Sequence, residues 1–261
     1  MIDETDPVTE DLDAGRMTIW EHIAELRGRL IKCTIAIVLG MVIGFMVYPY
    51  LLSFLLDPLC ELNESYCRLV ATDPLDPFAT RIKISAYIGI VLAMPVLLWQ
   101  IWRFVTPGLY PHEKRYAIPF VASALILFAF GAAIAYYTLN PALEFLISIA
   151  GTDVEPFYTP DNYVTLIAYM MLAFGVGFQF PVLLVALQIA GILTPQKLLG
   201  WWRYAVVIIV VFAAVATPSA DPISMMALAT PMFVFYAIAI VIGYVLQKAK
   251  RKRIDDPAAV S

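Results

Sequence analysis

Two glutamates, Glu25 and Glu113, stand among basic residues, where a carboxylate can pair with a cation. Glu25 lies in the segment TIWEHIAELRGR, four residues before Arg29. A glutamate four residues ahead of an arginine can pair with it along one helix face, so an internal pair is one interpretation of Glu25. Glu113 is the only acid of the segment WRFVTPGLYPHEKRY and stands directly beside Lys114. A weak surface ion pair is the corresponding interpretation of Glu113.

The rest of the sequence offers little for catalysis or for binding a cofactor. It has only two histidines, no Cys/His spacing of a zinc site, no Walker motif and no GxGxxG motif after a strand. We therefore expect no enzyme activity, no metal, no cofactor and no nucleic-acid partner. Cys60 and Cys67 fall in one predicted loop outside the cytoplasm, where a disulfide would close a small ring. The spacing leaves open whether they pair.

Gln179 and Asp221 are polar residues within or next to apolar stretches, and such residues are candidates for function. Gln179 precedes Pro181 and can bond either to a partner helix or to the backbone of a bent helix. Asp221 follows Thr217 and Pro218 in the short stretch TPSADP, where it can cap the next helix.

The elements that must position these residues are apolar helices. Hydrophobic residues make up 61% of the 261 residues and charged residues only 15%, whereas about a quarter of an average soluble domain is charged. One soluble core cannot bury so much apolar surface, and a helix needs about 20 apolar residues to span a bilayer. Six spans are predicted, at about residues 30–48, 82–102, 117–139, 163–192, 204–216 and 223–246.

Residues 204–216 are short for a span, and the distribution of positive charge decides their interpretation. If all six stretches cross, 14 of the 17 Lys and Arg residues fall on one side of the membrane, which is then the cytoplasmic side. We therefore predict an all-α polytopic membrane protein with both termini in the cytoplasm. Its membrane domain covers 18–247, between a disordered acidic tail at 1–17 and a basic tail at 248–261.

Two further features shape the predicted bundle. Residues 18–29 have an apolar face at helical spacing, so they are predicted to form an amphipathic helix on the cytoplasmic surface ahead of the first span. Pro95, Pro181 and Pro231 fall inside spans, where each removes a backbone hydrogen bond and is expected to kink its helix. Three kinked helices predict a concave, glove-like bundle. The sequence has no internal repeat.

Four motifs together resemble the TatC family of the twin-arginine protein-export system. They are HIAELRGRL (22–30), FVTPGLYPHEKR (104–115), AFGVGFQFPV (173–182) and TPSADP (217–222). They occur in order on consistent sides of the six predicted spans, and the similarity runs from about residue 18 to residue 246.

The resemblance implies a receptor for signal peptides that contain two consecutive arginines. Carried over to this sequence, the glutamates that bind the arginine pair are Glu25 and Glu113. Arginine pairs with a carboxylate through two parallel hydrogen bonds, which lysine cannot reproduce. The residues expected to shape the same patch are Leu26, Arg27, Phe104, Pro107 and Tyr110.

The resemblance also implies a location and partners. It implies a multi-pass protein of the bacterial inner membrane that self-associates, works with TatA and TatB and uses the proton-motive force. A partner helix is expected near Thr217, Pro218 and Asp221, while Gln179 stands where many relatives have a glutamate. A small-molecule secondary transporter is the alternative, but it predicts ionisable residues at mid-membrane and usually a repeat. A scaffold without transport activity is a third alternative, and it leaves the paired cytoplasmic glutamates unexplained.

Overall fold

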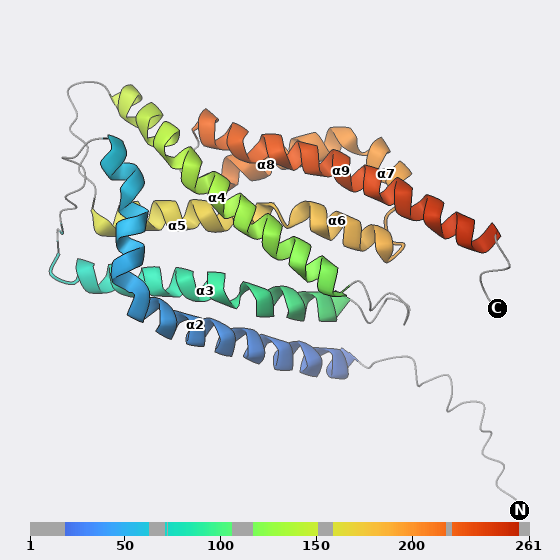
Figure 1. Cartoon of the computed structure of the whole chain (residues 1–261), viewed down its shortest axis with the longest axis horizontal. Helices are drawn as coiled ribbons and strands as arrows, with labels where there is room; N and C mark the ends of the chain where they lie inside the picture. Colours follow the sequence, from blue (N-terminus) through green and yellow to red (C-terminus); the bar gives the residue numbers. More distant parts are fainter. Residues whose placement is uncertain are drawn as a thin grey trace, which may run out of the picture.

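The computed structural model describes residues 19–62, 71, 73–105, 117–150, 159–217 and 221–255, and every element in these ranges is a helix (Figure 1). The helices are α2 (Ile19–Leu62), α3 (Asp76–Val105), α4 (Ala117–Ala150), α5 (Pro160–Gly177), α6 (Phe180–Ile189), α7 (Pro195–Gly200), α8 (Trp202–Ala216) and α9 (Pro222–Asp255). Five stretches are long and apolar enough to cross a membrane: α2, α3, α4, α5 with α6, and α9; α8 is a shorter apolar helix. The predicted all-α polytopic membrane protein is confirmed.

Helix α2 differs from the prediction at both of its ends. The segment expected as a surface helix is continuous with the first span, and the helix also runs past Tyr48 as far as Leu62. Pro49 and Pro58 lie inside it, and a proline costs the helix one backbone hydrogen bond and commonly bends it. Figure 1 shows the result, a long first part followed by a sharp turn and a shorter arm.

The loops expected between the spans are shorter than predicted. Helix α4 continues through Pro141 to Ala150, so it covers much of the loop expected at 140–162. Helix α3 begins at Asp76, whose carboxylate accepts a hydrogen bond from the backbone N–H of Asp73 at 2.9 Å. Such a bond satisfies a backbone donor close to the helix start. Apolar length alone therefore underestimates these helices, because each extends beyond its apolar part.

The fourth span is interrupted where a kink was predicted. α5 ends at Gly177 and α6 starts at Phe180, with Phe178 and Gln179 between them and Pro181 in the first turn of α6. The helix is therefore interrupted for two residues next to the predicted Pro181 kink, and both residues keep helical backbone angles. Pro95 and Pro231 lie inside α3 and α9, which remain continuous helices.

The last two helices have unequal lengths. Helix α8 has 15 residues, or about 22 Å at 1.5 Å per residue. Helix α9 has 34 residues and continues to Asp255, so part of the segment expected as a basic tail is helical. Residues 1–17, expected as an acidic tail, lie outside the described ranges.

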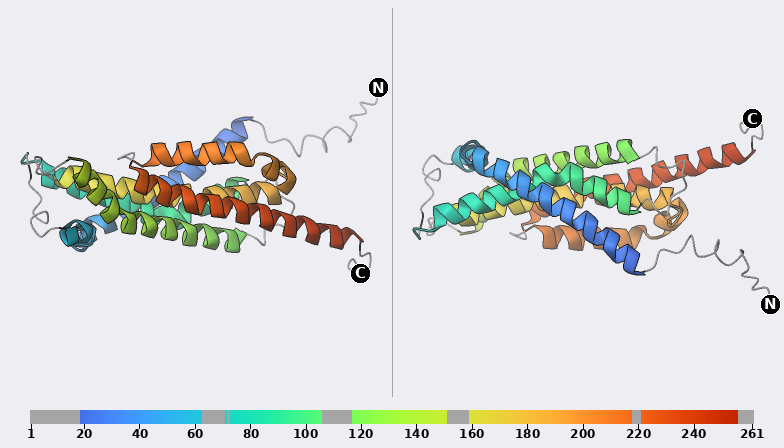
Figure 2. Two further views of the ribbon diagram at one scale, coloured as in Figure 1. Left: turned by 90° about the horizontal axis from the view of Figure 1, so that it is seen from above. Right: turned by 90° about the horizontal axis from the view of Figure 1, so that it is seen from below.

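The most extensive helix packing in the bundle is between α2 and α3, which lie side by side and cross at an angle in Figure 2. Gly40 and Gly44 of α2 meet Ser85 and Gly89 of α3 with no room for added side-chain atoms: a Cβ atom on Gly40 would lie 2.8 Å from the carbonyl oxygen of Gly89. Small residues four apart allow membrane helices to approach in this way.

The main core lies among α4, α5, α8, α9 and the arm of α2, and it contains fully buried Tyr163, Phe174 and Phe178. A second core joins α3, α4 and α6 around Trp102. The start of α2 and the end of α9 lie at the same end of the molecule in Figure 1. Most of α2 and α8 keeps apolar side chains exposed, as expected of helices that face lipid.

Candidate functional site

The candidate site begins at the first turns of α2, where Glu25 is held in place by Arg29. Nη2 of Arg29 forms an ion pair with Oε1 of Glu25, one helical turn away. Nη1 of Arg29 donates a hydrogen bond of 3.1 Å to the backbone oxygen of Gln100 on α3. The Arg29 side chain is only 10% exposed and that of Glu25 is 32% exposed. Arg29 therefore fixes the carboxylate against α3 and leaves part of it at the surface.

This position brings Glu25 to the end of α3 from which the loop containing Glu113 leaves. Gln100 lies five residues before the last residue of α3, Val105. The chain returns as α4 at Ala117, and α3 packs against α4. Glu25 thus lies close to the end of α3, where the predicted first cytoplasmic loop begins.

The helix ends that carry this loop are packed tightly. Trp102 on α3 is buried and its ring centroid lies 4.0 Å from that of Phe120 on α4. Met94, Leu98 and Val121 belong to the same buried cluster. Packing of this kind holds the end of α3 and the start of α4 at a fixed spacing.

The other residues predicted for this patch divide into two groups. Leu26 and Arg27 are exposed next to Glu25, with Leu26 49% accessible. Phe104 belongs to the last turn of α3, but its side chain lies outside the described residues, as do Pro107, Tyr110 and Glu113. The distance between the two glutamates thus stays outside the described structure, and the two-carboxylate site stays a prediction.

Gln179 lies at the break between α5 and α6 and bonds to the backbone. Its Nε2 atom donates to the carbonyl oxygen of Ala124 on α4 at 3.0 Å and to that of Gly175 at 3.3 Å. Both amide hydrogens therefore have acceptors within the chain. Of the two roles considered for Gln179 from the sequence, this contact is the bond to the backbone near a bent helix.

Thr217 and Asp221 end and begin helices. The Thr217 hydroxyl donates to the carbonyl oxygen of Ala213 at 2.9 Å, and Oδ1 of Asp221 accepts from the backbone N–H of Ser224 at 2.6 Å. Both residues are buried. Asp221 thus caps α9, which is the capping role considered for it from the sequence. Pro218 lies outside the described residues.

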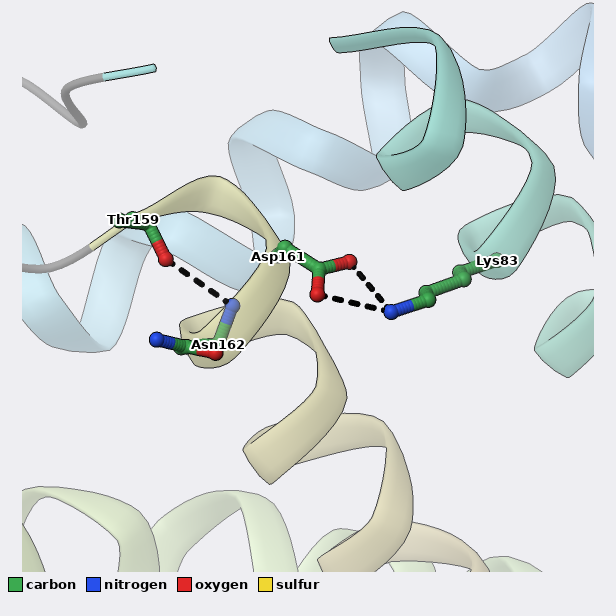
Figure 3. Close-up of polar contacts among 4 residues, drawn as sticks. All are labelled: Lys83, Thr159, Asp161 and Asn162. Atoms are coloured by element: carbon green, nitrogen blue, oxygen red, sulfur yellow. Dashed lines mark hydrogen bonds and ion pairs between the residues drawn. The ribbon is translucent and has the colours of Figure 1, made fainter. Parts of the chain in front are cut away.

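The opposite end of the molecule contains a polar network that the sequence did not reveal. Nζ of Lys83 on α3 pairs with both carboxylate oxygens of Asp161 on α5, at 2.6 and 2.8 Å (Figure 3). Thr159 caps the same end of α5 through the backbone N–H of Asn162. The Lys83–Asp161 pair is partly exposed, so it contributes at most about 1 kcal/mol of stability.

Hydrogen bonds also fix the arm of α2 at this end. The buried Tyr163 hydroxyl donates to the carbonyl oxygen of Leu55 at 2.8 Å, and that of Tyr136 donates to the carbonyl oxygen of Phe54 at 3.0 Å. The Phe54 bond has a signal in the sequence: Pro58 has no N–H for the carbonyl four residues earlier. Which side chain replaces that donor is decided by tertiary packing.

The structure describes two of the three cysteines and the side chains that could bind a metal ion. Cys60 is disulfide-bonded and Cys33 is a free thiol; Cys67 lies outside the described residues, so its pairing with Cys60 stays a prediction. Within the described ranges, no group of three or more His, Cys, Asp or Glu side chains is arranged to hold a metal ion.

Comparisons with known proteins agree with this arrangement. The family model of the Sec-independent protein translocase protein TatC matches residues 21–231. Curated relatives named Sec-independent protein translocase protein TatC include those of Frankia casuarinae, 36% identical over 95% of this chain and 71% of the relative, and of Aquifex aeolicus, 36% identical over 90% of this chain and 98% of the relative.

Solved structures give the same result. Two crystal structures of the twin-arginine translocase receptor TatC superpose with TM-scores of 0.71 and 0.73, at 36% and 37% sequence identity. They cover 86% and 85% of this chain, and in both cases 99% of the solved chain. These matches support the translocase interpretation over the small-molecule transporter. With a family model across most of its length and relatives that align nearly from end to end, the chain belongs to the TatC family of Sec-independent protein translocase proteins.

Proposed function

We propose that this chain is a receptor for twin-arginine signal peptides and the core subunit of a Tat translocase, which exports folded proteins across the bacterial cytoplasmic membrane. The names of its relatives and the two solved receptor structures support this function. The observation in this chain that carries the proposal is Glu25, a partly exposed carboxylate held by Arg29 against the end of α3.

The chemistry of Glu25 suits an arginine ligand. The carboxylate already accepts a guanidinium from Arg29, so its orientation is fixed before a peptide arrives, which lowers the entropic cost of binding. A peptide arginine at the exposed side can share the carboxylate through directional hydrogen bonds. A lysine offers one compact ammonium group and gains less from the same site. Glu113, on the adjoining loop, is proposed to hold the second arginine.

The surface beside Glu25 suits the rest of a signal peptide. Ile23, Leu26 and Leu30 are exposed by 49%, 49% and 65%, and they lie on the turns that surround Glu25. An export signal has an apolar stretch after its basic residues. We infer that the arginines pair with the glutamates while this stretch lies along the exposed apolar face of α2.

The proposed topology places the site in the cytoplasm. The start of α2 and the end of α9 lie at one end of the bundle, and the basic residues gather on that side of the predicted spans. TatA and TatB are the proposed membrane partners, with contacts near the Thr217–Asp221 turn and Gln179. Exposed apolar faces of α2 and α8 also allow self-association. No Walker motif occurs in the sequence, and the proton-motive force is the proposed energy source.

Crosslinking of a twin-arginine signal peptide to inside-out membrane vesicles tests this proposal. Glu25→Gln and Glu113→Gln are each expected to reduce crosslinking about tenfold, because each removes one charge-assisted pair. Glu144→Gln, which changes an exposed glutamate near the far end of α4, is the matched control and is expected to leave crosslinking unchanged. A peptide with two lysines in place of the arginines is expected to crosslink as poorly as the Glu25 variant. Undiminished crosslinking in both glutamate variants would refute the receptor site.

A further inference from the structure

Arg81 is a cation at the outer end of α3 that has no carboxylate partner in the described part of the chain. The nearby Lys83 is paired with Asp161. Arg81 is half-buried, and a half-buried charge without a counter-ion is costly beside a membrane. No described residue supplies this counter-charge, and an anion that binds from outside would supply it.

The guanidinium of Arg81 is held on one side only. Nη2 donates a hydrogen bond of 3.1 Å to the carbonyl oxygen of Phe45 on α2. That carbonyl lacks its helical donor because the residue four positions later is Pro49. The guanidinium carbon also lies 4.0 Å from the ring centroid of Phe45 and 5.3 Å from that of Tyr48, which adds cation–π attraction.

The other side of the guanidinium is available to a ligand. Its Nε atom is buried without an acceptor, and no hydrogen bond joins Nη1 to a described residue. The guanidinium thus has donors beyond the Nη2 bond, and phosphate oxygens are acceptors that arginine binds well.

The surroundings of Arg81 are those of a lipid headgroup boundary. Arg81 lies five residues, or about 7.5 Å, from the start of α3, near the edge of the stretch long and apolar enough to span a membrane. Exposed apolar and aromatic side chains stand close in sequence to Arg81 and to its contact residues Phe45 and Tyr48: Phe78 is 60% accessible, Met46 74% and Tyr50 78%. Aromatic residues gather at the level of the headgroups, and apolar side chains below them suit acyl chains.

We infer that Arg81, with Phe45 and Tyr48, forms a binding site for the phosphate group of an anionic phospholipid in the outer leaflet. An anionic lipid is favoured over a zwitterionic one because it supplies a net negative charge without an amine of its own to compete for the phosphate. The bound lipid would lie where Arg81 joins α2 to α3, so it would also stabilise the turn of α2.

Native mass spectrometry of the detergent-purified full chain with added phosphatidylglycerol tests the site. Arg81→Gln is expected to weaken phosphatidylglycerol binding about tenfold, since it removes one charge-assisted contact. Lys83→Gln removes the same charge two residues away and is expected to change binding less than about twofold. Phosphatidylcholine is expected to bind the wild-type chain no better than it binds Arg81→Gln.

Three outcomes would overturn the inference. Arg81→Gln binding phosphatidylglycerol as strongly as the wild-type chain would exclude the site. Displacement of the lipid by millimolar inorganic phosphate would show a site for a free anion. Loss of a co-purifying membrane protein from Arg81→Gln, with lipid binding unchanged, would show that a partner's carboxylate is the anion.

If Arg81→Gln fails to fold, Phe45→Leu replaces it. Loss of the ring beneath the guanidinium is expected to weaken lipid binding several-fold, and unchanged binding counts against the site.

Discussion

At the scale of single residues, the prolines of α2 determine which polar side chains are used. A proline leaves the carbonyl four residues earlier without its helical donor. Pro58 exposes the Phe54 carbonyl in this way, and the Tyr136 hydroxyl bonds to it at 3.0 Å. The two rings also stack, with centroids 4.6 Å apart and planes 6° from parallel. One tyrosine thus replaces the missing backbone donor and ties the arm of α2 to α4.

This pairing predicts the effect of Tyr136→Phe. The variant keeps the stacked ring but leaves the Phe54 carbonyl without a donor, so we expect a loss of about 1 kcal/mol of stability. Thermal unfolding in detergent should show a midpoint lower by about 2–4 °C. Tyr137→Phe is the control, because Tyr137 is 78% exposed. This variant is expected to leave the midpoint unchanged.

A double-mutant cycle identifies the cause of that loss. Pro58→Ala restores an N–H that can bond to the Phe54 carbonyl, so Tyr136→Phe should cost clearly less in the Pro58→Ala background than alone. Equal costs in both backgrounds would mean that the hydroxyl acts through some other contact.

The residues of the candidate site show how far single-residue reasoning extends. The i, i+4 spacing predicted the Glu25–Arg29 pair, which the structure contains. It could not predict that Arg29 also reaches Gln100, because that contact joins residues 71 positions apart. The same holds for Lys83 and Asp161, which lie on different helices. Local spacing encodes contacts within a helix, whereas contacts between helices depend on how the helices cross.

At the scale of elements, α2 and α3 can cross this closely because glycine, which has no side chain, stands at the crossing. A Cβ atom added to Gly89 would lie 2.7 Å from the carbonyl oxygen of Ile37 and 2.8 Å from the backbone nitrogen of Met41. Backbone atoms cannot move aside as a flexible side chain can, so the two helices would have to separate.

Gly89→Ala is therefore expected to destabilise the protein by about 1–3 kcal/mol. Gly28→Ala is the matched control on α2, since nothing lies within 4 Å of its added Cβ. There alanine should be neutral or stabilise the helix by up to about 1 kcal/mol. Thermal unfolding of both variants in detergent measures the difference; a Gly89→Ala midpoint at or above that of the wild-type chain would contradict the tight crossing.

Helix ends were the elements hardest to predict. Apolar length located the apolar stretch of every long helix, but α2 and α4 continue beyond it to Leu62 and Ala150. The extensions are stabilised by tertiary contacts, such as the bond from Asn140 to Glu61 at 2.9 Å. The break near Gln179 was indicated by Pro181, because proline leaves a visible mark in the sequence.

At the scale of the whole molecule, α8 and α9 form a hairpin, and the segment before α8 meets α9 at the end away from their connection. The Gln196 side chain, just before α8, donates to that of Gln247 near the end of α9 at 2.9 Å. The Tyr236 hydroxyl on α9 likewise donates to the carbonyl oxygen of Leu198 at 2.6 Å. If α9 crosses the membrane, these contacts require the short α8 to cross it in the opposite direction. Charge distribution along the sequence predicted six crossings without any knowledge of these bonds.

Cysteine labelling tests this topology directly. We expect Asp73→Cys, at an exposed position before α3, to react with a membrane-impermeant maleimide in intact cells above the level of the parent chain. Gln196→Cys and Lys248→Cys should react only after the membrane is opened, because α7 and the end of α9 lie on the cytoplasmic side of the proposed topology. Reaction of Lys248→Cys in intact cells, with Gln196→Cys still protected, would show that α8 does not cross. Since the two side chains of the Gln196–Gln247 bond would then lie on opposite sides of the bilayer, that single result would contradict both the charge argument and the observed hairpin.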